Sequence, residues 1–221
     1  MRKSIASNIE WKKWGQTDPL MGVATRTGRD KHGRNPWTPE EFYELGRSDW
    51  SDFFERWKRH GVDTTSSLEI GCGAGRFTAQ IAKSFGAVFA LDVSEGMIEY
   101  ARRNIDANSV TFLLGDGIHI PLADVSTTAV FSAHVFQHFD SLSHTSAYFR
   151  EVARVLVPGG TMIIHLPIHH WPAMPGLFTA VYRIRKRIGD IRAWAKRLLM
   201  RAGLSYHHFM RGLSYPIPYL L

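Results

Sequence analysis

The stretch L-E-I-G-C-G-A-G-R-F, residues 68–77, decides the fold. An apolar run that contains one acid, Glu69, leads into glycines at positions 71, 73 and 75. Glycine permits positive φ and lets the backbone approach a ligand without a Cβ in the way. A strand that ends in such a turn before a helix begins is typical of a nucleotide-like ligand site. The glycine pattern alone does not establish a ligand site, because turns also use glycine for structural reasons.

Strand and helix patterns alternate from residue 66 onward, which indicates a βαβ series. The expected strands are residues 66–70, 87–92, 110–114, 129–133 and 161–166. The expected helices lie near residues 76–84, 95–104 and 143–156. Right-handed crossovers then predict an α/β fold, a doubly wound and mostly parallel sheet with helices on both faces. Its ligands are expected at the carboxyl ends of the strands.

Two carboxylates follow the next two strands. Asp92 ends the second strand, 21 positions after Gly71, where a carboxylate can accept hydrogen bonds from both ribose hydroxyls. Asp116, in L-L-G-D-G, can accept from an exocyclic amine while the Gly117 amide faces a ring nitrogen. Either aspartate alone is also typical of a cap or turn. Because the signals fall on three consecutive strand ends, together they predict an adenosine cofactor.

Arg76 and Glu69 distinguish between adenosine cofactors. A dinucleotide fingerprint would need a small residue at position 76, where this chain has arginine. Glu69 is badly placed beside a pyrophosphate and well placed near a cationic amino or sulfonium group. Both residues favour S-adenosyl-L-methionine, and an NAD(P)-dependent oxidoreductase remains the alternative enzyme class.

Five motifs in order resemble those of class I S-adenosyl-L-methionine-dependent methyltransferases, and the closest subgroup is the ubiquinone/menaquinone-biosynthesis-like one. The resemblance covers about residues 66–167. The motifs are L-E-I-G-C-G-A-G-R-F, A-L-D-V-S-E-G-M-I-E-Y-A-R, L-G-D-G, F-S-A-H-V-F-Q-H-F and E-V-A-R-V-L-V-P-G-G-T-M-I-I.

The resemblance implies a Rossmann-like sheet of order 3-2-1-4-5 and methyl transfer to an O-, N- or C-nucleophile of a small-molecule or lipid-like acceptor. It also implies a set of cofactor-binding residues: Glu69, Gly71, Cys72, Gly73, Gly75, Asp92, Val93, Met97, Asp116, Gly117, Ala133 and His134. The family usually finishes its sheet with an antiparallel hairpin. The last residues of this chain read as loop and a helix start, so we do not expect those two strands.

Histidines at the later strand ends are candidates for proton transfer. Methyl transfer is an in-line displacement in which positioning supplies much of the acceleration, and a hydroxyl or phenol acceptor also needs a base. The candidates are His134, His138, His165, His169 and His170, of which His134, His138 and His169 rank first as catalytic residues. No metal site is predicted, because Val135 stands where an H-E-x-x-H motif has glutamate.

The segment before the sheet is aromatic and partly helical. Thr38 and Pro39 predict a helix start, and this helix is expected to end near Arg47. Ser48 and Asp49 offer a second cap before an apolar stripe of Trp50, Phe53, Phe54 and Trp57. The expected organisation is an N-terminal helical cap over 1–60, the cofactor-binding core over 61–168, and a basic amphipathic helix with a tail over 169–221.

Charge is unevenly distributed along the 221 residues, whose formal net charge is +7. Residues 177–221 hold nine lysines or arginines and one acid, so the remaining body is close to neutral and does not indicate a nucleic-acid binder. Spacing over 177–203 predicts a basic amphipathic helix, which either packs on the domain as part of the acceptor region or contacts anionic lipid. A non-enzymatic, membrane-associated binding module is a further alternative. The single cysteine and the lack of a long apolar segment favour a cytoplasmic protein, with peripheral membrane contact left open.

Overall fold

A computed structural model describes residues 5–26, 28–106, 108–169 and 215–216. The chain divides into two compact units, Met1–His165 and Leu166–Leu221. The helices of the first unit are α1 (Ala6–Thr17), α2 (Pro19–Val23), α3 (Pro39–Lys58), α4 (Thr78–Ile81), α5 (Glu95–Asn104) and α6 (Leu142–Val155), with a 3-10 turn, η1 (Phe136–His138). Its strands are β1 (Ser66–Ile70), β2 (Ala87–Asp92), β3 (Val110–Leu114), β4 (Thr127–Ser132) and β5 (Leu156–Ile164).

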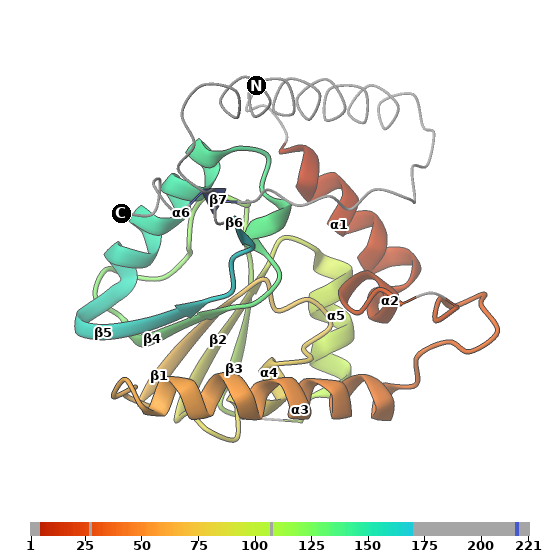
Figure 1. Cartoon of the computed structure of the whole chain (residues 1–221), viewed down its shortest axis with the longest axis horizontal. Coiled ribbons are helices and arrows are strands. Elements are labelled where there is room, and N and C mark those ends of the chain that lie inside the picture. The colour runs from red at the N-terminus through yellow and green to blue at the C-terminus, as the bar shows by residue number, and fades with distance from the viewer. Residues whose placement is uncertain (1–4, 27, 107, 170–214, 217–221) are drawn as a thin grey trace. The chain divides into compact units, whose positions relative to one another are not determined.

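The five strands form one sheet in the order β3-β2-β1-β4-β5, and every neighbouring pair is parallel. The predicted order is therefore confirmed. α3 and α6 lie on opposite sides of this sheet (Figure 1). Parallel strands place all their carboxyl ends at one edge, so the turns after β1, β2, β3 and β4 meet there.

The second unit is described only in part. β6 (Ile168–His169) pairs in parallel with β7 (Tyr215–Pro216). The predicted amphipathic helix over 177–203 lies outside the described residues, and the division of the chain into three parts stays a prediction. None of the described helices combines the length and apolar character that a membrane crossing requires.

α3 is one helix of 20 residues, and the predicted interruption after Arg47 is wrong. The predicted cap at its start is confirmed, because Thr38 and Glu41 form a reciprocal capping box. Asp49 does not cap a second helix. Its carboxylate instead pairs with Arg76 at 2.6 Å, and this contact between distant segments has no local signal in the sequence.

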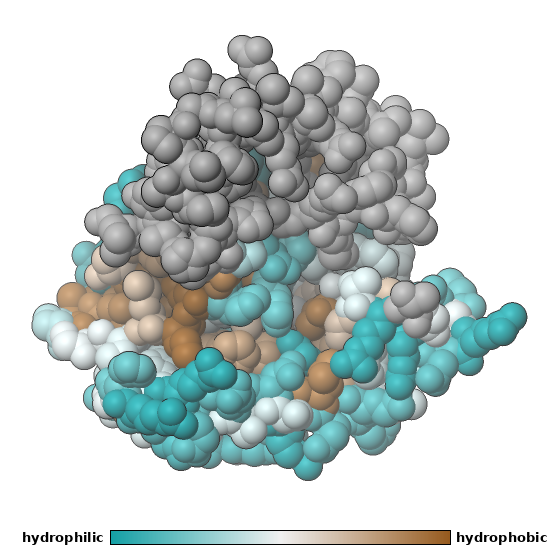
Figure 2. Space-filling view, viewed as in Figure 1, coloured by the Kyte–Doolittle hydropathy of each residue, from teal (hydrophilic) through white to brown (hydrophobic). Residues whose placement is uncertain are grey.

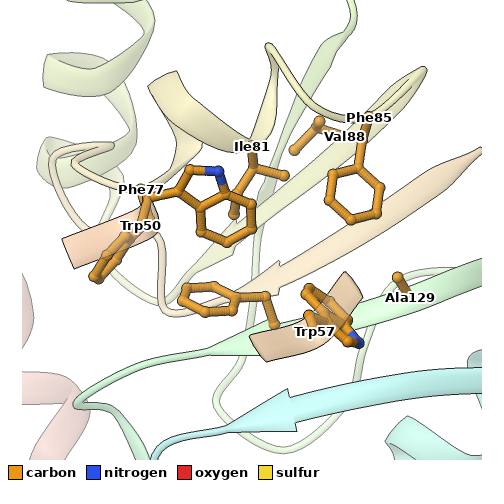
Figure 3. Packing of buried hydrophobic residues seen from close by; sticks show 8 residues of the cluster. Trp50, Trp57, Phe77, Ile81, Phe85, Val88 and Ala129 are labelled. Atoms are coloured by element: carbon orange, nitrogen blue, oxygen red, sulfur yellow. The ribbon is translucent and has the colours of Figure 1, made fainter. Parts of the chain in front are cut away.

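An aromatic core cluster lies between α3, α4 and the sheet (Figure 3). Its buried members are Trp50, Trp57, Phe77, Ile81, Phe85, Val88, Ala129 and Phe131. The predicted apolar stripe of α3 supplies the two tryptophans, and Trp57 Nε1 donates a hydrogen bond to Thr161 Oγ1 at 2.9 Å. The opposite face of α3 is hydrophilic, as the space-filling view shows (Figure 2). Burial of the aromatic face therefore fixes α3 against the sheet.

Two other element boundaries differ from the sequence prediction. The helix expected over residues 76–84 is reduced to α4, which has four residues between turns. β5 begins at Leu156, before the P-G-G segment, and its pairing with β4 shifts register between Thr127 and Ala129. The irregularity accommodates Pro158, Gly159 and Gly160 within the strand.

Gly46 lets α3 approach the glycine turn. A Cβ at this position would lie 2.3 Å from the Arg76 carbonyl oxygen, which belongs to backbone and cannot rotate away. An alanine in a helix usually stabilises relative to glycine. Here we expect Gly46→Ala to lower the free energy of unfolding by about 2 kcal/mol through overpacking, measured by urea denaturation. Ser48→Ala, on the exposed side of the same helix, is the control, and a stabilised Gly46→Ala variant would contradict the packing.

Candidate functional site

The glycine turn after β1 is built from residues with left-handed backbone. The φ angles are 75° at Gly71, 53° at Gly73 and 85° at Gly75. A Cβ at any of them would collide with a neighbouring side chain: Val135 at 2.2 Å, Val23 at 2.6 Å and Ile105 at 2.3 Å, respectively. The turn therefore requires glycine both for its conformation and for close packing by α2, α5 and the segment after β4.

Asp92 joins the end of β2 to this turn. Its Oδ2 accepts a hydrogen bond from the Gly73 amide at 2.8 Å, and its Oδ1 accepts from the Ser94 amide at 2.9 Å. The side chain is buried, and burial raises the pKa of the carboxyl above its ordinary value although the backbone donors lower it. A buried carboxylate that takes part in no ion pair with a described residue leaves negative charge at the turn.

Glu69 adds a second buried carboxyl group at the end of β1. Its side chain accepts a hydrogen bond from Thr78 Oγ1 at 2.6 Å. Burial raises the pKa of Glu69 to about 7, and the nearby charge of Asp92 acts in the same direction, whereas Thr78 and Arg76 oppose it. A cation bound near these two groups would offset the cost of their burial. Their chemistry thus fits a ligand with positive charge and hydroxyl donors.

Arg76 connects the turn to α3 rather than facing a phosphate. Besides its salt bridge with Asp49, the guanidinium lies over the Phe77 ring, 4.3 Å from the centroid. The side chain is buried, and its Nε has no hydrogen-bond partner among the described residues. Position 76 therefore holds a large side chain packed toward α3, where a dinucleotide fingerprint would need a small residue.

Asp116 closes the turn after β3. Its Oδ1 accepts from the amides of Ile118 and His119, both at 2.8 Å, and its Oδ2 lies 2.8 Å from His119 Nδ1. Burial would raise the pKa of this carboxyl, but the hydrogen bonds, chiefly those from His119, lower it to about 2. Asn8 of α1 donates to the Asp116 carbonyl oxygen at 2.9 Å and abuts Gly117. The adenine contact of Asp116 stays a prediction.

The N-terminal helices pack around the remaining predicted cofactor residues. Met97 is fully buried in α5, and its Cε is 3.1 Å from where a Cβ of Gly22 in α2 would lie. A Cβ at Gly15 of α1 would lie 2.2 Å from Ser94 Oγ and 2.9 Å from the Met97 amide nitrogen. Cys72 is buried within the turn, Val93 is half-buried, and Ala133 packs against the aromatic cluster.

The ends of β4 and β5 bring two histidine rings together. His134 has a left-handed backbone, φ 61°, and its ring centroid lies 4.4 Å from that of His165. Burial against neighbouring atoms, His165 and Arg76 all lower the pKa of His134. His165 was not ranked among the predicted catalytic residues. The sequence signal for His165 was its position directly after β5, because β5 is the neighbour of β4 in the sheet.

The other two ranked histidines do not lie in this pair. His138 belongs to η1, and its ring contacts Trp11 of α1 at a centroid distance of 4.9 Å. The side chain of His169 lies outside the described residues. Among the residues that the structure describes, no three histidine, cysteine or acidic side chains gather as they would around a metal ion.

Residues 68–164 match the family described as a methyltransferase domain. The matched range begins in β1 and ends with β5, so it contains the glycine turn and both buried carboxylates. The chain carries a class I S-adenosyl-L-methionine-dependent methyltransferase domain. The resemblance seen in the five sequence motifs is thereby confirmed.

Two curated relatives show how much of this methyltransferase domain is shared. Malonyl-acyl-carrier protein O-methyltransferase of Hahella chejuensis is 37% identical over 98 residues, covering 43% of this chain and 34% of the relative. Demethylmenaquinone methyltransferase of Symbiobacterium thermophilum is 32% identical over 124 residues, covering 50% and 48%. The chain thus spans a third to a half of the length of these relatives.

Solved structures resemble the methyltransferase domain at lower identity. Phosphoethanolamine N-methyltransferase 1 of Haemonchus contortus aligns with a TM-score of 0.56 at 18% identity, covering 72% of this chain and 31% of that one. N-methyltransferase NodS of Bradyrhizobium japonicum aligns with a TM-score of 0.54 at 18% identity, covering 72% and 71%. These similarities support the fold.

The raised pKa of Glu69 makes the stability of the methyltransferase domain depend on pH. Between its ordinary pKa of 4.5 and about 7, the folded state keeps a proton that the unfolded state loses. The free energy of unfolding should therefore fall by about 3 kcal/mol as the pH rises through this window. In Glu69→Gln, which keeps an acceptor for Thr78, we expect this part of the fall to disappear in urea denaturation between pH 4.5 and 8.

The control for this prediction is Glu55→Gln on the exposed face of α3. It should parallel the wild type, because Glu55 is exposed and its partner is a neighbour on the same helix. Asp92 contributes a slope of the same sign that remains in all three proteins. Parallel profiles for wild type and Glu69→Gln would contradict the burial argument.

Proposed function

We propose that this protein transfers a methyl group from S-adenosyl-L-methionine to a small-molecule acceptor by in-line displacement. The main support for this proposal is the position of Asp92, a buried carboxylate that holds the glycine turn against the end of β2 inside the matched domain. S-adenosyl-L-methionine, when bound, supplies an electrophilic methyl group on a positively charged sulfur. The domain supplies alignment and a negatively charged site, which suffice for much of the acceleration.

The proposed cofactor contacts follow the strand ends. Asp92 accepts from the ribose hydroxyls with the lone pairs that its two backbone bonds leave available. Glu69 and the glycine turn, with Cys72, hold the methionine portion. Asp116 and Gly117 hold the adenine edge, and Met97 packs on its face. Val93, Ala133 and His134 complete the set as predicted contacts.

The acceptor is proposed to be a small-molecule or lipid-like compound. In support, the relatives named above act on malonyl-acyl-carrier protein and on demethylmenaquinone, as their names state. The proposed acceptor region includes the basic segment 177–203, whose predicted amphipathic helix could also hold the protein at an anionic membrane surface. His134, His138 and His169 remain the proposed proton-transfer residues. The NAD(P) oxidoreductase alternative finds no support in the comparisons.

Cofactor binding tests this proposal directly. Titration calorimetry with S-adenosyl-L-methionine, S-adenosylhomocysteine and NAD⁺ should show binding of the first two only. Asp92→Asn should weaken the binding of S-adenosylhomocysteine by about 10- to 100-fold, because an amide replaces one carboxylate oxygen that accepts from the ribose. Asp52→Asn, on the exposed face of α3, is the matched control and should bind like the wild type.

Two results would argue against the proposed function. One is binding of NAD⁺ in preference to either sulfur nucleoside. The other is unchanged S-adenosylhomocysteine affinity in a folded Asp92→Asn variant, with folding checked by the urea transition. The second result would leave Asp92 with only its structural hydrogen bonds.

A further inference from the structure

Two adjacent strand ends present a pair of histidines at the proposed transfer edge. His134 follows β4 and His165 follows β5, strands that are neighbours in the sheet. Their ring centroids are 4.4 Å apart with an interplanar angle of 54°. The His165 amide donates to the Ser132 carbonyl oxygen at 2.8 Å, which continues the β4–β5 pairing up to this residue. The sheet itself therefore sets the spacing of the two rings.

The backbone of His134 is held in an uncommon conformation. Its φ of 61° places a residue with a Cβ in the left-handed region. Such conformations cost about 1–3 kcal/mol and persist where the surrounding structure determines them. Here the conformation turns the chain from β4 into η1, and it leaves His134 partly exposed and partly packed against neighbouring atoms, while Val135 packs on Gly71. One ring of the pair is thus accessible to a ligand.

The second ring carries a polar atom that the fold does not satisfy. His165 Nδ1 is buried and has no hydrogen-bond partner among the described residues. Leaving a buried polar atom without a partner costs about 1–3 kcal/mol. The Phe53 ring of α3 lies beside His165, with a centroid distance of 6.5 Å, and offers no acceptor. The unsatisfied nitrogen belongs to the ring that lies beside the partly exposed ring of His134.

Burial and the neighbouring charges together favour the neutral form of His134. His165 faces it from β5, Arg76 acts from the glycine turn, and Asp49 acts from α3. Burial, His165 and Arg76 lower the pKa of His134, and only Asp49 raises it. Asp49 is itself paired with Arg76 at 2.6 Å. A neutral imidazole at physiological pH is the form that accepts a proton.

We propose that His134 and His165 form the proton-accepting pair of the methyl transfer, and that they take the proton from the hydroxyl group of an alcohol or a phenol acceptor. This inference rests on the proposed function and specifies the substrate class of the same site. A carboxylate acceptor is already ionised at neutral pH, so its methylation would not require a proton-accepting pair. His134 is the residue that contacts the acceptor, and His165 is a positioning residue that acts through it.

The step is balanced without a further reactant. The hydroxyl oxygen of the acceptor forms a bond to the methyl carbon while the bond between carbon and sulfonium sulfur breaks. The electron pair of that bond stays on sulfur, which becomes a neutral thioether. The hydroxyl proton moves to a ring nitrogen of His134, and the resulting imidazolium loses it to solvent after the product leaves.

The test begins with the imidazole titrations, which need no acceptor. In the S-adenosylhomocysteine complex, NMR should show His134 titrating below its ordinary pKa of about 6.5. In His165→Asn, the His134 midpoint should move up by about 1 pH unit, because the neighbouring ring that lowers the pKa of His134 has been removed. His60→Asn, an exposed histidine after α3, is the matched control and should leave the midpoint unchanged. A purely structural role of His165 would not move the midpoint.

Turnover then tests the acceptor class with a panel of phenols, primary alcohols and carboxylic acids, measured as S-adenosylhomocysteine release. We expect hydroxyl acceptors to be methylated. His134→Asn should lower kcat for them about 100-fold and remove the fall of kcat/KM at acid pH. Asparagine tolerates the left-handed conformation, so this variant should keep the urea transition of the wild type, which checks that it folds.

The outcomes separate the two levels of the proposal. Failure of the wild type to bind S-adenosylhomocysteine would refute the proposed function itself. If S-adenosylhomocysteine binds, the proposal of a histidine pair would be refuted by a His134 titration midpoint that lies at its ordinary value and does not change in His165→Asn. Methylation of carboxylic acids alone, or an unchanged rate on hydroxyl acceptors in His134→Asn, would overturn it as well. If no compound in the panel reacts, the titration decides.

Discussion

The hydrogen bonds that Asp92 accepts from Gly73 and Ser94 are the constraint on which the site depends. They fix the glycine turn after β1 to the end of β2, so two separate strand ends act as one surface. A side chain at Gly73 would collide with Val23, so α2 can close on the turn only when that residue is glycine. The acid and the glycine are therefore required together, which explains why both occur in one motif set.

The same constraint creates an electrostatic cost. Asp92 and Glu69 are buried close to each other, and burial raises the pKa of both carboxyl groups. Without a ligand, the fold holds negative charge, or protons, where water is excluded. A sulfonium nucleoside would supply positive charge and hydroxyl donors to this position. Binding and stability are thus coupled through the same two side chains.

The sequence predicted the sheet and the cofactor edge because those features are local. Strand runs, the three turn glycines and the aspartates after β2 and β3 each occur within a few residues, and right-handed connections then determine the arrangement of the strands. The continuity of α3 was missed because Ser48 and Asp49 read as a cap. Asp49 is occupied instead by Arg76, which is 27 positions away. The local preference of Ser48 and Asp49 for a helix cap was therefore overridden by an ion pair between distant segments.

The histidines show the same limit at the acceptor side. His134 and His138 have helical spacing in the sequence, but the left-handed backbone at His134 prevents a helix and sends the two rings to different neighbours. His134 meets His165 only because β4 and β5 pair in parallel and end at the same level. The cofactor half of the site follows from motifs along the chain. The acceptor half is determined by the register between β4 and β5, and this register cannot be read directly from a single sequence.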